Sequence, residues 1–568
     1  MAMTEAFQAL LPPERYNIAE AILAHDPAKP ALLWENDAGD TREVTYGELR
    51  DLSDRLARAL EELELVKGDR VMVLMPRLPE TYVVYLALLK NGLVVLPGSE
   101  LLMPADIDYR LNHAEARAVI AHETLADRVD AVAEKTPSLE VRIIVGGPRP
   151  GWITLASLIE DATEPPAPVE TTRDDLAFLS YTSGTTGYPK GVMHTHGWAH
   201  AHFTIAAKRW LDIRPDDVVW ATAAPGWAKW IWSPLVATLM SGATGFHYLG
   251  RFEPERYLGL LEKYRINVLC ATPTEYRMMA KVDGLERFRL DALRSAVSAG
   301  EPLNREVIDT FRRVFGVTVR DGYGQTENTL LVATTVDVEL RPGSMGRPTV
   351  PGAVEIVDEN GRIVPPGVVG DIAVRRDFPP LFKGYFRDPE RTEAAFRGEW
   401  YITGDQAKKD DDGYFWFEGR ADDIIISSGY TIGPFEVEDA LVKHPAVKES
   451  AVVASPDEVR GAIVKAFVVL KDPALLEAVR ADAVRREALV VELQEHVKRI
   501  TAPYKYPRAI EFVDDLPKTV SGKIRRVELR RREWAKVKET ERAKEGQGAG
   551  DRSPGIGHST ETFGESAT

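Results

Sequence analysis

The chain has very little cysteine, because Cys270 is the only one among 568 residues. A single cysteine excludes an internal disulfide framework and a cluster of thiolate metal ligands, and it fits a reducing compartment. Cys270 itself lies in the apolar run 267–271, where a buried core residue is a better interpretation than a nucleophile. We therefore expect a cytoplasmic protein that folds without disulfides.

Long apolar runs are also missing. The sequence has no stretch of 18 apolar residues, and its first six residues lack the basic and apolar regions of a signal peptide. The net charge of −16 disfavours nonspecific binding to nucleic acid, although a local basic funnel for a phosphorylated cofactor is compatible with it. We therefore expect a protein that does not insert stably into a membrane and does not bind nucleic acid.

What the sequence does contain is enough chain for several folded units. With 44% hydrophobic and 28% charged residues it is typical of a globular protein, and 568 residues exceed a single core. Helical periodicity at 46–60 and 80–89 alternates with an apolar strand pattern at 69–75. This alternation predicts α/β subdomains built on parallel sheets.

The second half changes character twice. Residues 342–401 are rich in Gly, Pro and short β-like runs, such as 353–358 and 370–375, and predict a small distorted β-barrel. After residue 420 a compact α+β pattern follows, with strands expected at 423–427, 447–454 and 464–470 and helices at 434–444 and 480–499. We accordingly divide the chain into a large N-terminal domain (1–419), a hinge (420–423), a small mobile C-terminal domain (424–540) and a disordered tail (541–568).

Residues 181–191, Tyr-Thr-Ser-Gly-Thr-Thr-Gly-Tyr-Pro-Lys-Gly, form a candidate phosphate loop. It is not a Walker loop, because only two residues separate Gly184 from Gly187 and Lys190 is followed by glycine. Its backbone N–H groups and hydroxyls can still form an anion-binding nest, with Lys190 as the counter-charge. A polar surface turn is the plain alternative. The loop follows the apolar run 176–179, however, and open α/β sheets keep ligand sites at the ends of such strands.

Four other segments carry groups suited to nucleotide chemistry. In 321–327, Tyr323 can stack on a purine and Glu327 is a hard oxygen ligand for Mg²⁺. Asp405 can accept ribose hydroxyls, and the segment 419–423 places an arginine and two acids between lobes. Lys523, on a Ser-Gly turn, can neutralise a phosphate in a transition state. Each segment alone also fits a solvated turn or a surface ion pair.

In this order, over roughly residues 15–538, the five segments resemble the AMP-forming acyl-CoA synthetases of the adenylate-forming superfamily. The stretches 428–438, 444–447 and 496–508 look most like the medium-chain acyl-CoA synthetases, and next like benzoate and aminobenzoate ligases. The resemblance implies an acid–thiol ligase that uses ATP, Mg²⁺ and coenzyme A. In that family a carboxylate attacks ATP to give acyl-AMP and pyrophosphate, and coenzyme A then displaces AMP, so the resemblance implies the same two steps here.

The resemblance also implies roles for individual residues. It makes Lys523, Glu327, Thr186 and Lys190 the catalytic set, with Glu327 as the Mg²⁺ ligand and Asp422 as the hinge. The residues implied to hold ATP are Thr182, Ser183, Gly184, Thr185, Thr186, Gly187, Lys190, Gly300, Glu301, Pro302, Asp321, Gly322, Tyr323, Gly324, Gln325, Thr326, Asp405, Arg420 and Lys523. Those implied to meet coenzyme A are Ser428, Gly429, Tyr430, Arg460 and Lys498.

The acyl pocket is predicted from Gly324 and a tryptophan-rich segment. Acetate enzymes of the family place a tryptophan immediately before the glutamine, where its indole fills the pocket, whereas this chain has Gly324. The missing indole predicts room for several methylenes or a ring, each buried methylene being worth ~0.8 kcal/mol. Trp227 and Trp230 are the predicted aromatic walls, although one or two of the tryptophans in 225–232 are expected in the core. A medium-chain fatty acid is the predicted substrate, and an aryl acid is the alternative.

Two further functions stay open. One is an adenylation enzyme that charges a separate carrier protein, and the other is a noncatalytic nucleotide-binding protein. The joint presence of Lys190, Glu327, Asp405, Arg420 and Lys523 argues against the second. Two protein partners are compatible with the sequence: a second copy in a homo-oligomer, and a lysine acetyltransferase with its deacetylase, since acetylation of Lys523 would remove its charge.

Overall fold

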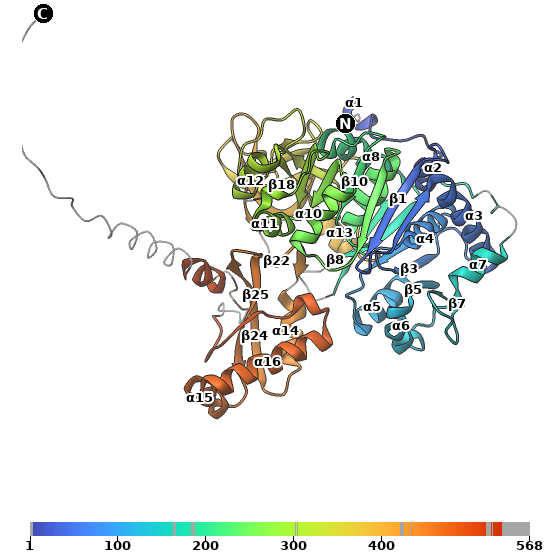
Figure 1. The fold of residues 1–568 in the computed structure, drawn as a ribbon. Coiled ribbons are helices and arrows are strands. Elements are labelled where there is room, and N and C mark those ends of the chain that lie inside the picture. The colour runs from blue at the N-terminus through green and yellow to red at the C-terminus, as the bar shows by residue number, and fades with distance from the viewer. Residues whose placement is uncertain are drawn as a thin grey trace, which may run out of the picture.

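A computed structural model of the chain describes residues 4–162, 166–167, 169–182, 188–300, 303, 305–420, 425–432, 434–517, 524, 526 and 528–536. The structure contains two large sheets, a smaller antiparallel sheet and a C-terminal α+β domain (Figure 1). The predicted hinge residue Asp422, residues 183–187 of the phosphate loop, Lys523 and the tail 541–568 lie outside the described residues. The predicted domain boundaries therefore stay predictions.

The first large sheet has seven strands in the order β7-β6-β5-β3-β4-β8-β9, and only the β8–β9 pair is antiparallel. The strands are β3 (Arg70–Leu74), β4 (Val94–Gly98), β5 (Ala118–His122), β6 (Val141–Val145), β7 (Ile153–Thr154), β8 (Leu176–Thr182) and β9 (Lys190–Thr195). Strands β3 and β4 are buried along almost their whole length, as expected for a parallel sheet that is covered on both faces.

The second large sheet has nine strands in the order β16-β15-β14-β13-β12-β10-β11-β1-β2. Its centre, from β14 to β1, is parallel, and antiparallel strands close both edges. The strands are β1 (Pro30–Asn36), β2 (Thr41–Thr45), β10 (Val218–Ala221), β11 (Thr244–Leu249), β12 (Val268–Ala271), β13 (Ser295–Ala299), β14 (Val319–Gly324), β15 (Leu330–Ala333) and β16 (Arg347–Pro348). Cys270, on β12, is buried as predicted.

Helices cover both sheets. They are α1 (Glu5–Gln8), α2 (Ile18–Leu23), α3 (Tyr46–Glu62), α4 (Pro79–Lys90), α5 (Pro104–Ala114), α6 (Ala126–Ala133), α7 (Leu155–Asp161), α8 (His196–Ala206), α9 (Ala228–Trp230), α10 (Pro254–Lys263), α11 (Pro273–Ala280) and α12 (Arg305–Phe315). The other helical segments are η1 (Glu123–Leu125), η2 (Ala207–Leu211), η3 (Ile231–Thr238) and η4 (Leu285–Arg287), of which η2 and η3 are π-helical. Helix α3 begins at a capping box formed by Thr45 and Glu48. The nearly all-apolar α4 packs between α3 and the sheets.

The region predicted to be a distorted barrel is a five-stranded antiparallel sheet. Its strands are β17 (Val354–Val357), β18 (Val369–Arg375), β19 (Phe396–Arg397), β20 (Trp400–Lys409) and β21 (Phe415–Arg420). Helix α13 (Pro389–Ala394) lies between β18 and β19 in the chain. Its buried side chains belong to the same core as those of the second large sheet. The predicted fold class, α/β with an added β region and a small α+β domain, is therefore confirmed.

The C-terminal domain contains a hairpin and a three-stranded sheet with helices against it. The elements are β22 (Ile425–Ser427), β23 (Tyr430–Ile432), α14 (Pro434–Val442), β24 (Val447–Asp457), β25 (Gly461–Leu470), α15 (Pro473–Ala481), α16 (Ala483–Ile500), η5 (Pro503–Lys505) and β26 (Ala509–Phe512). The helix predicted at 480–499 corresponds to α16, which begins only after Asp482, its N-cap residue; the preceding helix α15, which Asp482 ends, was not predicted. Within the described residues, no helix combines the length and apolarity needed to cross a bilayer.

Candidate active site

A cavity of about 1020 Å³ lies where the carboxyl ends of the parallel strands meet the C-terminal domain. Its wall includes Thr182 at the end of β8, Thr272 after β12, Ala299 at the end of β13 and Gly324 at the end of β14. Strand ends of two sheets therefore converge on one space, as is typical of ligand sites in open α/β folds. Most of the predicted site residues that the structure describes border this cavity.

Asp405, on β20, is held by two side chains from the segment 321–327. Tyr323 Oη donates a 2.7 Å hydrogen bond to Asp405 Oδ2, and Gln325 Nε2 donates another of 2.7 Å to the same oxygen. Gln325 Nε2 also donates to the backbone carbonyl of Thr403, and Tyr401 Oη donates to the side-chain oxygen of Gln325. A buried carboxylate needs such partners, and here they fix its orientation next to the cavity.

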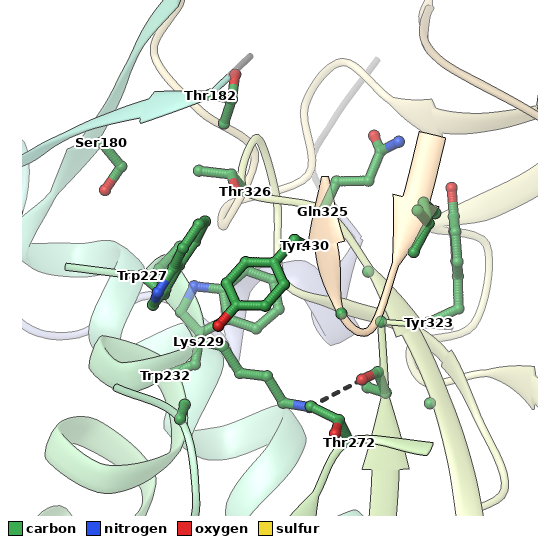
Figure 2. Close-up of a pocket in the computed structure, with 18 of the residues that line it drawn as sticks. Ser180, Thr182, Trp227, Lys229, Trp232, Thr272, Tyr323, Gln325, Thr326 and Tyr430 are labelled. Atoms are coloured by element: carbon green, nitrogen blue, oxygen red, sulfur yellow. Dashed lines mark hydrogen bonds between the residues drawn. The ribbon is translucent and has the colours of Figure 1, made fainter. Parts of the chain in front are cut away.

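A second group of contacts orders the strand end that leads to Gly300. Lys229 Nζ donates a 2.9 Å hydrogen bond to the carbonyl oxygen of Ala299, as Figure 2 shows. Gly300 follows with φ of 107°, a conformation that favours glycine. Asp321 lies nearby on β14, and burial raises the pKa of its carboxyl to about 7, although the Gly322 N–H donates to it. Glu301 and Pro302 are outside the described residues.

Lys190 and Glu327 meet through a tyrosine that the sequence did not single out. Lys190 Nζ donates to Tyr385 Oη at 3.1 Å, and Tyr385 Oη donates to Glu327 Oε1 at 3.0 Å. The ammonium lies 3.7 Å from the Glu327 carboxylate and 4.5 Å from the Tyr385 ring centre. Burial and the neighbouring Glu327 raise the pKa of Tyr385, so it stays a neutral donor.

Tyr385 reaches this place because the segment around it pairs with β9. Val192 and Tyr385 form an antiparallel bridge, and Phe386 N donates to the carbonyl oxygen of Gly191 at 2.7 Å. On the other side, His194 Nε2 lies 2.5 Å from the carbonyl oxygen of Thr326. Since that carbonyl can only accept, Nε2 carries the proton, and burial lowers the pKa of His194 to about 4. Strand β9 is thus bonded both to the segment that carries Tyr385 and to the segment that carries Glu327.

The donor set fits a magnesium ion that substrate phosphates complete. Glu327 supplies one buried carboxylate at the cavity wall, and its oxygens are the hard ligands that Mg²⁺ prefers. In the part of the chain that the structure describes, no group of three or more His, Cys, Asp or Glu side chains could hold a metal ion. Such a site resembles those in which Mg²⁺ keeps several waters and binds one or two carboxylates plus phosphate oxygens.

The C-terminal domain enters the cavity through the tip of the β22–β23 hairpin. Ser428 and Gly429 both have positive φ, of 50° and 79°, and Ser427 pairs with Tyr430 across this two-residue turn. The Tyr430 ring lies 5.4 Å from Trp227, edge to face, and 4.3 Å from Tyr504, stacked. Figure 2 shows Tyr430 and Trp227 side by side at the cavity. Residues predicted to meet coenzyme A therefore lie beside the predicted acyl pocket.

Two other predicted coenzyme A residues lie differently. Arg460 borders the cavity, and its Nη1 donates to Ser428 Oγ at 3.1 Å. Lys498 does not belong to the cavity wall. It forms a 2.6 Å ion pair with Glu495 and lies over the Tyr506 ring. Arg420 pairs with Asp405 across strands β20 and β21, but its side chain is not among the described ones.

The two predicted tryptophan walls have different fates. Trp227 borders the cavity, whereas Trp230 does not. The assignment of Trp230 to the acyl pocket is wrong in this structure, because its ring is 1% exposed and packs against Tyr82 and Tyr85 of α4. Trp232 borders the cavity in its place, 5.2 Å from the His202 ring. The π-helical turns of η3 begin at residue 231, so the usual helical spacing does not tell which tryptophan faces the cavity.

Gly324 borders the cavity but has a second constraint. A Cβ atom at this position would overlap the carbonyl oxygen of Thr329, because the β14–β15 pairing shifts register after Tyr323. A close approach of two backbone segments therefore requires glycine here. The open space of the pocket is thus shaped by the bulge and by Trp232, and not simply by the missing side chain at 324.

The other predicted site residues either border the cavity or lie outside the residues that the structure describes. Those on the wall are Thr182, Lys190, Gly300, Asp321, Gly322, Tyr323, Gly324, Gln325, Thr326, Glu327, Asp405, Ser428, Gly429, Tyr430 and Arg460. Those outside the described residues are Ser183, Gly184, Thr185, Thr186, Gly187, Glu301, Pro302, Asp422 and Lys523. No role was predicted for Lys229, Tyr385 or Tyr504, because no predicted chemistry calls for them. Trp232 was predicted only as one of the tryptophans in 225–232 that line either the pocket or the core.

Both halves of the chain match known family models. Residues 19–386 match the AMP-binding enzyme family, and residues 436–523 match the AMP-binding enzyme C-terminal domain. The second match begins within helix α14 and includes the turn that carries Arg460. The two matches include Lys190 and Glu327 on one side of the cavity and Arg460 on the other, whereas Asp405 and the hairpin tip lie between the matched ranges.

Individual proteins resemble the chain over nearly its whole length. The uncharacterized acyl-CoA ligase YtcI of Bacillus subtilis is 57% identical, with 92% of this chain and 97% of that protein covered. The mitochondrial acyl-coenzyme A synthetase ACSM3 of Homo sapiens is 43% identical, with 92% and 91% covered. A crystal structure of the anthranilate CoA ligase AuaEII with anthranoyl-AMP has a TM-score of 0.70 and 29% identity, covering 94% of this chain and 100% of that one.

Proposed function

The chain belongs to the AMP-binding enzyme family and is an acyl-CoA synthetase, and we propose that it activates medium-chain fatty acids. The observation that carries the proposal is the single cavity bordered at once by Asp405, Glu327 and Lys190 of the N-terminal domain and by the hairpin tip of the C-terminal domain. One cavity that reaches from a nucleotide-type site to a mobile second domain suits an enzyme that first makes an acyl-AMP and then passes the acyl group to a thiol.

The reaction has two steps. In the first, an oxygen of the fatty acid attacks the α-phosphorus of ATP, the bond to the β-phosphate breaks, and pyrophosphate leaves. In the second, the sulfur of coenzyme A attacks the acyl carbonyl, the bond to AMP breaks, and the thiol proton passes to solvent. Neither step needs a covalent enzyme intermediate, so catalysis consists of positioning and charge neutralisation.

In the first step the protein holds the nucleotide at three places. We assign the ribose hydroxyls to Asp405, whose carboxylate Tyr323 and Gln325 already orient. We assign adenine to the wall between Gly300 and Asp321, which Lys229 holds in place through Ala299. We assign the triphosphate to Thr182, Lys190 and the loop that connects them. Lys523, assigned by its motif, supplies the positive charge at the α-phosphate.

When Mg²⁺ is bound, it neutralises phosphate charge, and Glu327 is the residue that would hold it. Tyr385 orients the Glu327 carboxylate by its 3.0 Å hydrogen bond. Lys190, 3.7 Å from the same carboxylate, is an ion-pair partner that can turn to phosphate when the nucleotide arrives. The carboxylate is therefore positioned before substrate binds.

The arrangement of the C-terminal domain suits the second step. Ser428, Gly429 and Tyr430 border the cavity at the acyl side, where a pantetheine arm must enter to reach the acyl carbonyl. We propose that the first step uses a rotated arrangement in which Lys523 replaces this hairpin. Asp422, in the linker between the domains, is the proposed hinge.

Acid-dependent ATP–pyrophosphate exchange tests the proposal. We expect octanoate and butyrate to support exchange and thioester formation better than benzoate, 2-aminobenzoate or acetate. The Lys523→Ala variant should lose exchange but still convert supplied octanoyl-AMP and coenzyme A to the thioester. Fastest turnover of acetate would contradict the pocket assignment, and equal loss of both half-reactions in Lys523→Ala would contradict the division of labour.

One observation favours an aryl acid as the second candidate. The cavity wall is rich in aromatic rings at Trp227, Trp232 and Tyr430, which suit a flat ring as well as an alkyl chain. The same comparison of acids decides between the two, because an aryl-CoA ligase would use benzoate or 2-aminobenzoate faster than octanoate. Release of AMP without free coenzyme A, onto a carrier protein, would favour the carrier-charging alternative.

The setting of the enzyme is also a proposal. The reduced, buried Cys270 supports a cytoplasmic location. A homo-oligomer, and acetylation of Lys523 by an acetyltransferase with reversal by a deacetylase, remain the proposed protein interactions. Full exchange activity of protein acetylated at Lys523 would contradict that form of control, since acetylation removes the charge that adenylation requires.

A further inference from the structure

Arg277 forms a hydrogen bond between the two domains. It lies on α11 of the N-terminal domain, is 5% exposed, and its Nε donates a 2.9 Å hydrogen bond to the carbonyl oxygen of Val459 in the C-terminal domain. Its Nη2 donates to Thr274 Oγ1 at 2.7 Å, which holds the guanidinium in place on the helix. Burying a guanidinium is costly unless its donors find acceptors, so the position of Val459 matters for this side chain.

Val459 lies in a turn that is held by hydrogen bonds of its own, in addition to its contact with α11. The turn joins β24 to β25, and Asp457 Oδ1 accepts from Val459 N at 3.0 Å and from Arg460 N at 2.7 Å. Gly461 closes the turn with φ of 75°. The Val459 carbonyl therefore belongs to a turn whose backbone is held by the Asp457 side chain.

The same turn holds the hairpin tip that enters the cavity. Arg460 Nη1 donates to Ser428 Oγ at 3.1 Å, and Ser428 N donates to the Arg460 carbonyl at 3.3 Å. Ser428 and Arg460 both border the cavity, as do Thr274 and Met278 of α11. Helix α11 thus forms part of the cavity wall and, through Arg277, also contacts the 457–461 turn of the C-terminal domain.

We propose that Arg277 is a positioning residue for the thioester-forming step. By binding the Val459 carbonyl it seats the 457–461 turn on α11 and thereby holds Ser428, Gly429 and Tyr430 at the acyl side of the cavity. The inference rests on the proposed function, in which the C-terminal domain rotates between the two steps. Rotation removes Val459 from Arg277, so the contact stabilises only the arrangement for the second step and contributes nothing to adenylation.

The two half-reactions measured separately test this role. Arg277→Met keeps most of the side-chain volume and removes the donors. We expect thioester formation from supplied octanoyl-AMP and coenzyme A to slow at least tenfold in kcat, while acid-dependent ATP–pyrophosphate exchange stays within twofold of the unaltered protein. The matched control is Arg287→Met, which removes an exposed arginine paired with Glu255 inside one domain and should change neither rate.

Two more variants separate positioning from folding. Arg277→Lys retains a donor and should recover part of the lost rate. Asp457→Ala loosens the turn from the other domain, and combined with Arg277→Met it should cost less than the product of the two single effects, because both act through Val459. The exchange rate of each variant reports whether the N-terminal site is folded.

The outcomes that overturn the inference differ from those that overturn the proposed function. An unchanged thioester rate in Arg277→Met, or equal losses in both half-reactions, refutes the positioning role. A rise in KM for coenzyme A with unchanged kcat refutes it too, since it indicates direct binding of the cofactor by Arg277. Absence of acid-dependent exchange in the unaltered protein instead refutes the proposed function itself.

Discussion

Tyr323 Oη donates a 2.7 Å hydrogen bond to Asp405 and so joins the second large sheet to the smaller antiparallel sheet. Tyr323 lies on β14 and Asp405 on β20, and Gln325 donates to the same carboxylate oxygen. The ribose acceptor that we propose is therefore fixed by the segment that we propose to hold adenine. Nucleotide recognition at the two places is coupled through one carboxylate.

The Tyr323→Phe variant measures that coupling. Removing one hydrogen bond to the Asp405 carboxylate should raise KM for ATP in the exchange assay about fivefold, equivalent to about 1 kcal/mol. Tyr264→Phe is the control, because it removes a tyrosine–carboxylate hydrogen bond, to Glu35, away from the cavity wall. Equal effects of the two variants on KM would show that the Tyr323 contact is structural only.

The two neighbouring tryptophans should behave oppositely. Trp230→Phe leaves a gap beside Tyr82 and Tyr85, so we expect a lower free energy of unfolding and an unchanged order of preference among acids. Trp232→Ala removes a ring from the cavity wall and should shift the preferred fatty acid to a longer chain, at ~0.8 kcal/mol for each additional buried methylene. The measurement is kcat/KM for a series of straight-chain acids. A shift in chain length with Trp230→Phe and none with Trp232→Ala would reverse our assignment.

Gly324 should tolerate no side chain. Gly324→Ala places a Cβ against the Thr329 carbonyl, so the backbone must move, and we expect a loss of about 1–3 kcal/mol in the free energy of unfolding. Gly259→Ala, in α10, is the matched control. Nothing lies within 4 Å of the added methyl there, and the helix should gain up to about 1 kcal/mol. Denaturant unfolding of both variants checks this, and a neutral Gly324→Ala would mean that the bulge relaxes freely.

Asp321 gives the folded protein a pH dependence of known sign. Burial raises the pKa of its carboxyl from 3.8 to about 7, so between these pH values the folded protein holds a proton that the unfolded chain has lost. This group therefore lowers the free energy of unfolding as the pH rises through that window. The amide in the Asp321→Asn variant cannot titrate, so the stability of this variant relative to the parent should increase from pH 5 to pH 8. Denaturant unfolding without nucleotide measures it, and a difference independent of pH would falsify the assignment.

Much of the fold could be predicted because local patterns determine it. The alternation of helical and strand periodicity located α3, β3 and α4 to within a few residues. Helix α15 was not predicted, and the start of α16 was placed at residue 480, because one residue, Asp482, both ends α15 and caps α16. The short strand β26 was missed because it is stabilised by pairing with the distant β25, and β23 was missed because it is only three residues long.

The site divides in the same way. Lys190, Glu327 and Asp405 could be predicted because each belongs to a short motif with its own chemistry. Tyr385 could not, because it reaches Glu327 only through pairing with β9, which no local pattern announces. The exchange of Trp230 for Trp232 has a different cause. The tryptophan-rich segment 225–232 predicts aromatic walls, but which of its rings faces the cavity depends on packing against α4 and on the π-helical turn that begins at residue 231.

The solitary cysteine has a practical consequence for watching the enzyme work. Cys270 is 1% exposed, and burial raises the pKa of its thiol, so little reactive thiolate is available to a labelling reagent. Two cysteines introduced on exposed positions, one in each domain, would be the sites that take up spin labels or fluorophores. Distance spectroscopy therefore needs no prior removal of a native cysteine, and it can test in solution whether the proposed rotation between the two steps takes place.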